Sequence, residues 1–183
     1  MQVIADNFNL GFDEIVRANP QIKNAALIQE GSEITIPLVH LVPHFEPEGI
    51  IINLAESRLY FFHQNDVLTF PIADGMDQRT PLGHTKIIGK RQNPSWTPTE
   101  SIRKENPNLP KIVPPGPKNP LGNHAIYLDG SKSVKWWRII LHGTNSWWTI
   151  GSKVSHGCIR LRARDIKTLF DNVKAGMDVE ILN

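Results

Sequence analysis

The chain has 183 residues, with 20 Lys or Arg and 18 Asp or Glu, so its formal net charge is +2. Hydrophobic residues make up 40 % and charged residues 21 %, the composition of an ordinary globular domain. No apolar run approaches about 18 residues, which argues against a transmembrane helix, and there is no polybasic tract for nucleic acid or anionic membranes. The single cysteine excludes an internal disulfide and the paired-cysteine zinc folds.

The first 37 residues are predicted to form a small α/β unit. Apolar residues recur at helical spacing over 3–8 and over 12–16, while Ile34 and Ile36 alternate like a short strand. A unit of fewer than about 40 residues is too small to be robust alone. Residues 38–48 are rich in proline and are predicted to be a stiff linker.

Residues 49–183 are predicted to be mainly β. A hairpin loop is predicted at 63–66. A helix is predicted near the C-terminus, because one apolar face would carry Ile166, Leu169, Phe170 and Val173, and Gly176 would end it. Short runs rich in β-branched and aromatic residues predict strands at 50–54, 58–62, 67–72, 85–88, 125–128, 134–141 and 179–181.

A long irregular insertion interrupts this pattern. Residues 94–120 contain eight of the fourteen prolines. Such an insertion in a compact domain is more often a lid or a binding loop than filler.

The reactive side chains gather in residues 139–161. The segment Ser155-His156-Gly157-Cys158 holds the only cysteine, and His142 ends an apolar run 16 residues before it. A thiol becomes a useful nucleophile when an imidazole takes its proton, and a returning loop could bring His142 to Cys158. Gly157 removes side-chain bulk beside the thiol, so the amides of Gly157 and Cys158 are candidate oxyanion-hole donors.

Two other interpretations of Cys158 remain open at this point. A lone cysteine is often a buried, inert core residue. A zinc site built from His142, His156 and Cys158 is a second alternative, although it lacks the short paired spacings of known zinc sites.

The motif His142-Gly143-Thr144, followed by Ser155-His156-Gly157-Cys158-Ile159-Arg160, resembles the signature of the YkuD-type L,D-transpeptidases. The resemblance extends over residues 49–183. The turn Thr80-Pro81-Leu82-Gly83 fits the family's Thr-Pro-x-Gly, and segments 94–99 and 114–122 look like the branch that attaches lipoprotein to peptidoglycan. The resemblance implies a YkuD-like β-sandwich with one principal C-terminal helix.

The same resemblance implies a two-step acyl transfer without metal or cofactor. Cys158 would attack the carbonyl of the third residue of a peptidoglycan stem peptide and expel D-alanine. An amine, from a second stem peptide (a 3→3 cross-link) or from a lipoprotein lysine, would then take the acyl group. His142 would be the base, oriented by the carbonyl of Gly143. Hydrolysis or amidase chemistry on stem-peptide or lipoprotein–peptidoglycan bonds, and non-catalytic wall binding, are the alternatives.

Four further residues are candidates for substrate binding. Arg160 could hold a stem-peptide carboxylate or form a structural ion pair with the C-terminal helix. His156 could bond substrate or line the oxyanion site, Ser155 belongs to the same motif, and Tyr127 is the nearest candidate for a cleft tyrosine. For the pairs Trp136-Trp137 and Trp147-Trp148, hydrophobic packing is favoured over a role in the cleft wall.

Residues 4–37 resemble the later part of a LysM module, a small peptidoglycan-binding fold, with the first strand and the start of the first helix missing. Glycan binding and a plain packing or dimerisation role are both compatible with such a remnant. No signal peptide is visible at Met1-Gln2-Val3-Ile4. The resemblance implies a periplasmic or cell-wall-associated protein whose partners are stem peptides and an outer-membrane lipoprotein. Composition predicts no nucleic-acid partner and no membrane span.

Overall fold

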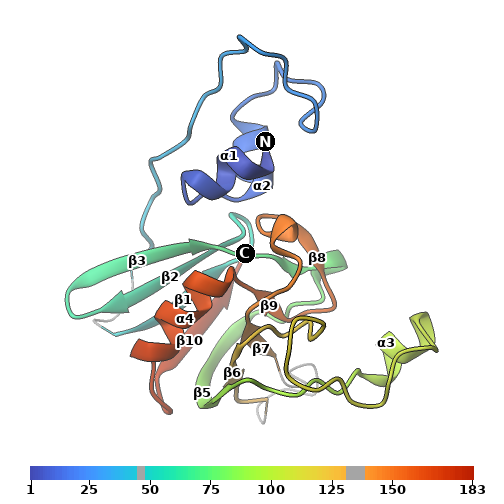
Figure 1. Cartoon of the computed structure of the whole chain (residues 1–183). Helices are drawn as coiled ribbons and strands as arrows, with labels where there is room; N and C mark the ends of the chain where they lie inside the picture. The colour runs from blue at the N-terminus through green and yellow to red at the C-terminus, as the bar shows by residue number, and fades with distance from the viewer. Residues whose placement is uncertain (45–47, 131–138) are drawn as a thin grey trace.

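The computed structural model describes residues 1–44, 48–130 and 139–183. A small helical unit at the N-terminus lies against one end of a larger β-rich lobe (Figure 1). The helices are α1 (Gln2–Asn7), α2 (Phe12–Arg17), α3 (Glu100–Glu105) and α4 (Ala163–Asn172), with 3-10 turns η1 (Met76–Gln78) and η2 (Trp147–Thr149). The strands are β1 (Gly49–Asn53), β2 (Arg58–His63), β3 (Asp66–Pro71), β4 (Asp74–Gly75), β5 (Gly83–Gln92), β6 (His124–Leu128), β7 (Ile140–His142), β8 (Lys153–Ser155), β9 (Ile159–Arg160) and β10 (Asp178–Leu182).

The β-rich lobe is built on one curled eight-stranded sheet, with a small second sheet beside it. The strand order is β3-β2-β1-β10-β5-β6-β7-β9, and β4 pairs in parallel with β8. The pairs β1–β10 and β7–β9 are parallel and the other neighbours are antiparallel. The mainly β prediction is confirmed, and the lobe consists of one curled sheet of eight strands with a two-stranded sheet beside it.

The core follows from alternation along the strands. Ile50 and Ile52 on β1 lie in the same buried cluster as Ile166 and Leu169 of α4. The apolar spacing of α4 therefore covers one face of the sheet, as its sequence predicts. Gly176, with a φ of 89°, lies in the turn after the helix, which ends at Asn172.

Most predicted strands lie within one or two residues of the observed ones. The exceptions are β5, which is longer than 85–88, and the run 134–141, of which the structure describes only the end as β7. Trp136 and Trp137 lie outside the described residues. Within the described ranges, no helix has the length and apolar character needed to cross a bilayer.

The N-terminal unit has its own small core but no strand. Met1, Ala5, Leu10 and Ile15 form a buried cluster, and segment 33–44 is irregular. The predicted strand at 34–36 is therefore wrong. A strand needs a partner for its backbone groups, and here a side chain takes that role: Asn19 Nδ2 donates to the Thr35 carbonyl, and the Thr35 amide donates to Asn19 Oδ1.

Candidate active site

The register of β7 and β9 places the reactive residues on one face of the sheet. His142 lies opposite Arg160, and Leu141 lies opposite Ile159. Because side chains alternate along a strand, Cys158, two residues before Arg160, points to the same face as His142. Leu141 and Ile159 point to the other face, where both are fully buried. The core side chains and the reactive side chains therefore lie on opposite faces of the sheet.

His142 is fixed as a neutral base. The residue is 4 % exposed, and its Nδ1 lies 2.5 Å from the carbonyl oxygen of Gly143. A carbonyl only accepts hydrogen bonds, so Nδ1 carries the proton and Nε2 keeps its lone pair. Burial lowers the pKa of His142 to about 4; the bond to Gly143 opposes this shift, and the charge of Arg160 adds to it. The ring is therefore neutral near pH 7.

Cys158 is a free, half-buried cysteine on the same face of the sheet as this base. Burial raises the pKa of its thiol, while a backbone hydrogen bond from Ile140 and the charge of Arg160 act in the opposite direction. Since the net shift is upward, the resting group near neutral pH is a thiol that needs a base in order to attack. Arg160 influences the pKa of both Cys158 and His142, which places the three groups in one electrostatic environment.

The turn before Cys158 is held by Ser155. This serine is 1 % exposed; its Oγ donates to the Cys158 carbonyl (2.6 Å) and accepts from the Gly157 amide (3.0 Å). Ser155 therefore shapes the turn from beneath, instead of meeting substrate as the motif had indicated. The Gly157 amide is already engaged, so it can reach an oxyanion only after leaving Ser155.

Thr80 supports the same turn from a distant part of the chain. It is 2 % exposed; its Oγ1 accepts from the Gly75 amide and donates to the Gly157 carbonyl, both at 2.9 Å. Gly157 has a φ of 121°, and a Cβ there would lie 3.0 Å from the Arg79 carbonyl oxygen. In the sequence, only the Thr-Pro-x-Gly turn indicates a role for Thr80.

The guanidinium of Arg160 is available to bind a ligand. It is half-buried, and in the described parts of the chain no carboxylate forms an ion pair with it. The alternative of a structural ion pair with the C-terminal helix is therefore wrong. A cation that shares a face with Cys158 and has no carboxylate counter-ion among the described residues suits an anionic ligand.

His156 points to the long insertion. Its Nε2 lies 2.7 Å from Oε2 of Glu105, the last residue of α3. Segment 94–120 thus contacts the cysteine motif directly. Because His156 contacts Glu105, it does not join His142 and Cys158 in the alternative zinc site. The described residues hold no cluster of three or more potential metal ligands.

Tyr127 and the second tryptophan pair flank the site in different ways. Tyr127 is half-buried and lies opposite Ile140 in the β6–β7 ladder, on the same face as His142. Trp147 and Trp148, in the connection between His142 and Cys158, are 42 % and 58 % exposed and contact each other edge to face, with ring centroids 6.4 Å apart. These two rings therefore pack on each other at the surface and lie outside the buried core.

A cavity in the lobe lies apart from the thiol. It measures about 550 Å³ and lies between the insertion, residues 143–145 and the start of α4. Gly143 and Ile166 line it, and Ile166 belongs to the core on the far side of β7 from Cys158. The reactive side chains do not border it.

Within a curled, mainly β lobe, a neutral histidine on β7 shares a face of the sheet with a cysteine just before β9, an arrangement typical of the class of proteins with a thiol nucleophile and a histidine base. The chain belongs to the YkuD family of L,D-transpeptidase catalytic domains, whose sequence profile matches residues 47–181. Its relatives include two probable L,D-transpeptidases of Escherichia coli strain K12. YcfS is 44 % identical and ErfK/SrfK 39 % identical, each over the whole of this chain. The chain spans 58 % and 59 % of their respective lengths.

Solved structures share the fold. The catalytic domain of an Enterococcus faecium L,D-transpeptidase superposes with a TM-score of 0.53 at 21 % identity, covering 76 % of this chain and all of that one. The L,D-transpeptidase LdtMt1 in complex with imipenem gives 0.54 at 19 % identity, covering 73 % of this chain and 57 % of that one.

Proposed function

We propose that this chain is a cysteine L,D-transpeptidase acting on peptidoglycan stem peptides. The observation that carries the proposal is the β7–β9 pairing, which puts a thiol and a histidine with a free Nε2 on one face of the sheet. Family membership supports the reaction type, and the unpaired Arg160 supports an anionic peptide as substrate.

The chemistry follows from the protonation states. Cys158 Sγ attacks the carbonyl carbon of the third stem residue while its proton passes to His142 Nε2. The oxyanion is stabilised by the Cys158 amide, joined by the Gly157 amide if that group leaves Ser155. Collapse breaks the peptide bond, and D-alanine leaves with the proton from His142. An acceptor amine then attacks the thioester, its proton returns through His142, and Cys158 is released.

The remaining assignments follow from this reaction. Arg160 would bind a carboxylate of the stem peptide, with Tyr127 and His156 lining the donor side. The acceptor would be a second stem peptide or a lysine of an outer-membrane lipoprotein, and the protein would act in the periplasm or at the cell wall. We assign 49–183 to catalysis, 38–48 to a linker and 1–37 to a LysM-like remnant.

The test is release of D-alanine from a purified tetrapeptide-stem muropeptide. We expect release by the wild-type chain and none by Cys158→Ala, with product masses that separate amine transfer from hydrolysis. A carbapenem should add once to the intact protein, on the peptide that contains Cys158. Release of D-alanine by Cys158→Ala would contradict the assignment of the nucleophile.

The role of Arg160 has a separate measurement. Arg160→Gln keeps a polar side chain but removes the charge, so we expect a KM for the stem peptide at least about ten-fold higher. The same change should leave KM unaltered for a substrate whose stem carboxylates are amidated. An equal effect on both substrates would contradict carboxylate binding.

A further inference from the structure

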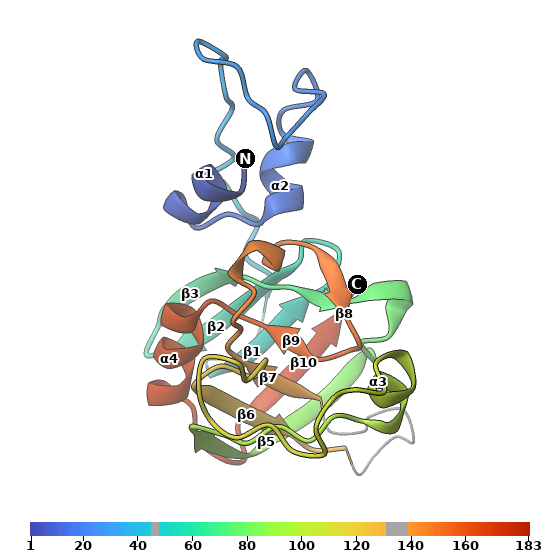
Figure 2. The ribbon, with the colours of Figure 1, turned by 45° about the vertical axis from the view of Figure 1, so that its right-hand side comes forward.

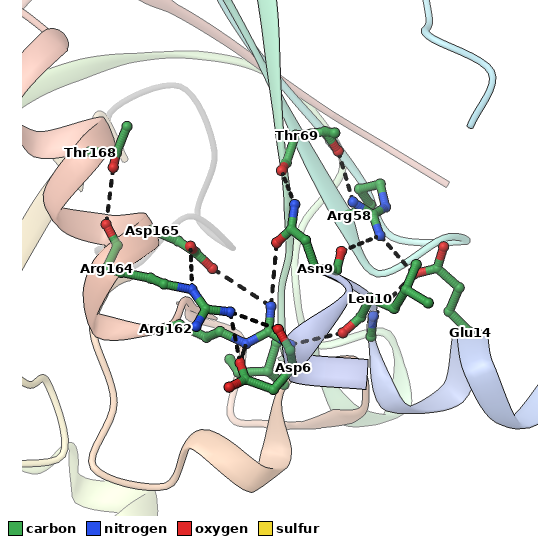
Figure 3. A network of polar contacts seen from close by, with 12 residues as sticks. Asp6, Asn9, Leu10, Glu14, Arg58, Thr69, Arg162, Arg164, Asp165 and Thr168 are labelled. Atoms are coloured by element: carbon green, nitrogen blue, oxygen red, sulfur yellow. Dashed lines mark hydrogen bonds and ion pairs between the residues drawn. The ribbon is translucent and has the colours of Figure 1, made fainter. Parts of the chain in front are cut away.

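The catalytic lobe binds the N-terminal unit through Arg162, four residues after Cys158. Arg162 is 4 % exposed. Its Nη2 donates to the Leu10 carbonyl (2.8 Å), and its Nε lies 2.5 Å from Asp6 Oδ1 (Figure 3). The same Asp6 oxygen lies 2.8 Å from Arg164 Nη2. The end of β9 and the start of α4 are therefore attached to α1 and the turn after it.

A second buried arginine anchors the unit on β2. Arg58 is 1 % exposed, and its Nη2 donates to Glu14 Oε2 (2.7 Å) and to the Asn9 carbonyl (3.1 Å), as Figure 3 shows. Burial alone would raise the pKa of Glu14, but the Arg58 charge and hydrogen bonds from Gly11, Arg58 and His40 hold it below its usual value. Glu14 thus stays charged and paired.

The N-terminal unit also contacts the segment that leads to Cys158. The amides of Phe12 and Asp13 donate to the carbonyls of Ile150 (3.2 Å) and Gly151 (3.1 Å). These contacts require two glycines at the crossing. A Cβ on Gly151 would lie 2.0 Å from the Phe12 nitrogen and 2.3 Å from the Gly11 Cα. The two backbones therefore touch directly, above β8 and β9 in Figure 2.

We propose that the N-terminal unit is a positioning element of the catalytic centre, because it holds the segment 150–162 at both ends. Backbone hydrogen bonds fix residues 150–151, and Asp6 with the Leu10 carbonyl fixes Arg162. Cys158 lies between these two attachments. This inference rests on the proposed function and adds a role for residues 6–13 in the reaction itself, apart from any binding to the wall.

The physical reason is the geometry that acyl transfer needs. His142 is fixed within the sheet by its strand partners and by Gly143. Cys158 instead follows a long connection and precedes a strand of two residues, β9, so its position depends on what holds that segment. A displacement of about 1 Å at a reacting atom can cost roughly 100-fold in rate. Releasing the N-terminal unit should therefore lower kcat.

A pair of glycine variants tests this directly. Gly151 and Gly176 both have a φ of 89°, so alanine causes similar backbone strain at each, but only Gly151 faces the N-terminal unit, since nothing lies within 4 Å of a Cβ on Gly176. For D-alanine release per titrated thiol, we expect Gly151→Ala to lower kcat at least about ten-fold with KM within about two-fold. Gly176→Ala should keep the wild-type kcat. A wild-type kcat in Gly151→Ala would overturn the proposal.

A second pair of variants tests the proposal if Gly151→Ala does not fold. Asp6→Asn weakens the hold on Arg162, whereas Asp171→Asn removes only a surface pair with Lys167 on the outside of α4. We expect kcat to fall in Asp6→Asn and to stay unchanged in Asp171→Asn, both measured at a temperature at which each variant is fully folded. Equal kcat values in the pair would overturn the role of Asp6. A wild-type chain that releases no D-alanine would instead refute the proposed function.

Discussion

Cys158 and His142 have pKa shifts in opposite directions, and both shifts have burial as their main cause. The thiol pKa is raised and the imidazole pKa is lowered, so the proton remains on sulfur in the resting site. The pair is thus a neutral thiol with a neutral base. Proton transfer has to accompany the attack on substrate.

These protonation states predict that the Cys158 thiol reacts slowly with alkylating reagents at neutral pH. Cys158 is the only cysteine, so iodoacetamide labelling reports on it alone. We expect the labelling rate at pH 7 to be below that of a free cysteine, whose pKa is about 8.5, and to rise continuously beyond pH 9. A fast rate that stays constant between pH 6 and pH 8 would show a resting thiolate and contradict this prediction.

The lowered pKa of His142 also predicts acid sensitivity of the fold. The unfolded state binds a proton near pH 6.5 but the folded state only near pH 4, so the free energy of unfolding falls as pH decreases between these values. For this buried ring the loss reaches about 3 kcal/mol at pH 4. Urea unfolding at pH 7 and pH 4 measures it, and His142→Asn should remove this part of the pH dependence. An equal dependence in the variant would assign the acid sensitivity to other groups.

At the scale of elements, the long insertion is ordered by one buried asparagine. Asn119 is 1 % exposed, and its Nδ2 donates to the carbonyls of Pro94, Val113 and Pro114 while its Oδ1 accepts from the Leu121 amide. These bonds join the two ends of segment 94–121. The ordered insertion can then present Glu105 to His156.

Asn119→Ala should therefore loosen the insertion. It removes the Asn119 bonds to the Pro94 carbonyl and from the Leu121 amide, both of which are buried, at a cost of about 1–3 kcal/mol. We expect faster limited proteolysis within 94–121 and little change in the sheet. Asn123→Ala, at an exposed position nearby, is the matched control and should be cleaved like the wild type. Equal cleavage of the two variants would show that the Asn119 side chain does not order this segment.

The elements differ in how far their sequences predict them. Strands β1, β2 and β6 were predictable because each is a run of β-branched or aromatic residues between turn residues, and α4 because its apolar residues share one face. The pairing of β7 with β9 could not be predicted by periodicity, since it joins short strands across a long connection. The motif around Cys158 was recognisable, but the hydrogen bonds of Thr80 and Ser155 depend on that pairing.

At the scale of the whole molecule, the unexpected feature is how closely the two parts join. Arg58 and Arg162 look like surface residues in the sequence, because arginine is seldom fully buried without a partner. Their partners, Glu14 and Asp6, lie on a segment predicted to be a separate module. The domain boundary predicted from composition therefore gives no indication of the interface between the N-terminal unit and the β-rich lobe. That interface becomes visible only in the three-dimensional structure.

The two parts are expected to unfold cooperatively. Glu14→Ala removes the carboxylate partner of a buried guanidinium, which typically costs about 3–5 kcal/mol. All five tryptophans follow residue 95, so their fluorescence in urea reports on the β-rich lobe alone. Because Arg58 belongs to that lobe, we expect Glu14→Ala to lower the midpoint of the fluorescence transition. Glu33→Ala, at an exposed position of the same unit, should leave the midpoint unchanged. If Glu14→Ala also left it unchanged, the N-terminal unit would unfold independently, and its contacts with β2 would add nothing to the stability of the lobe.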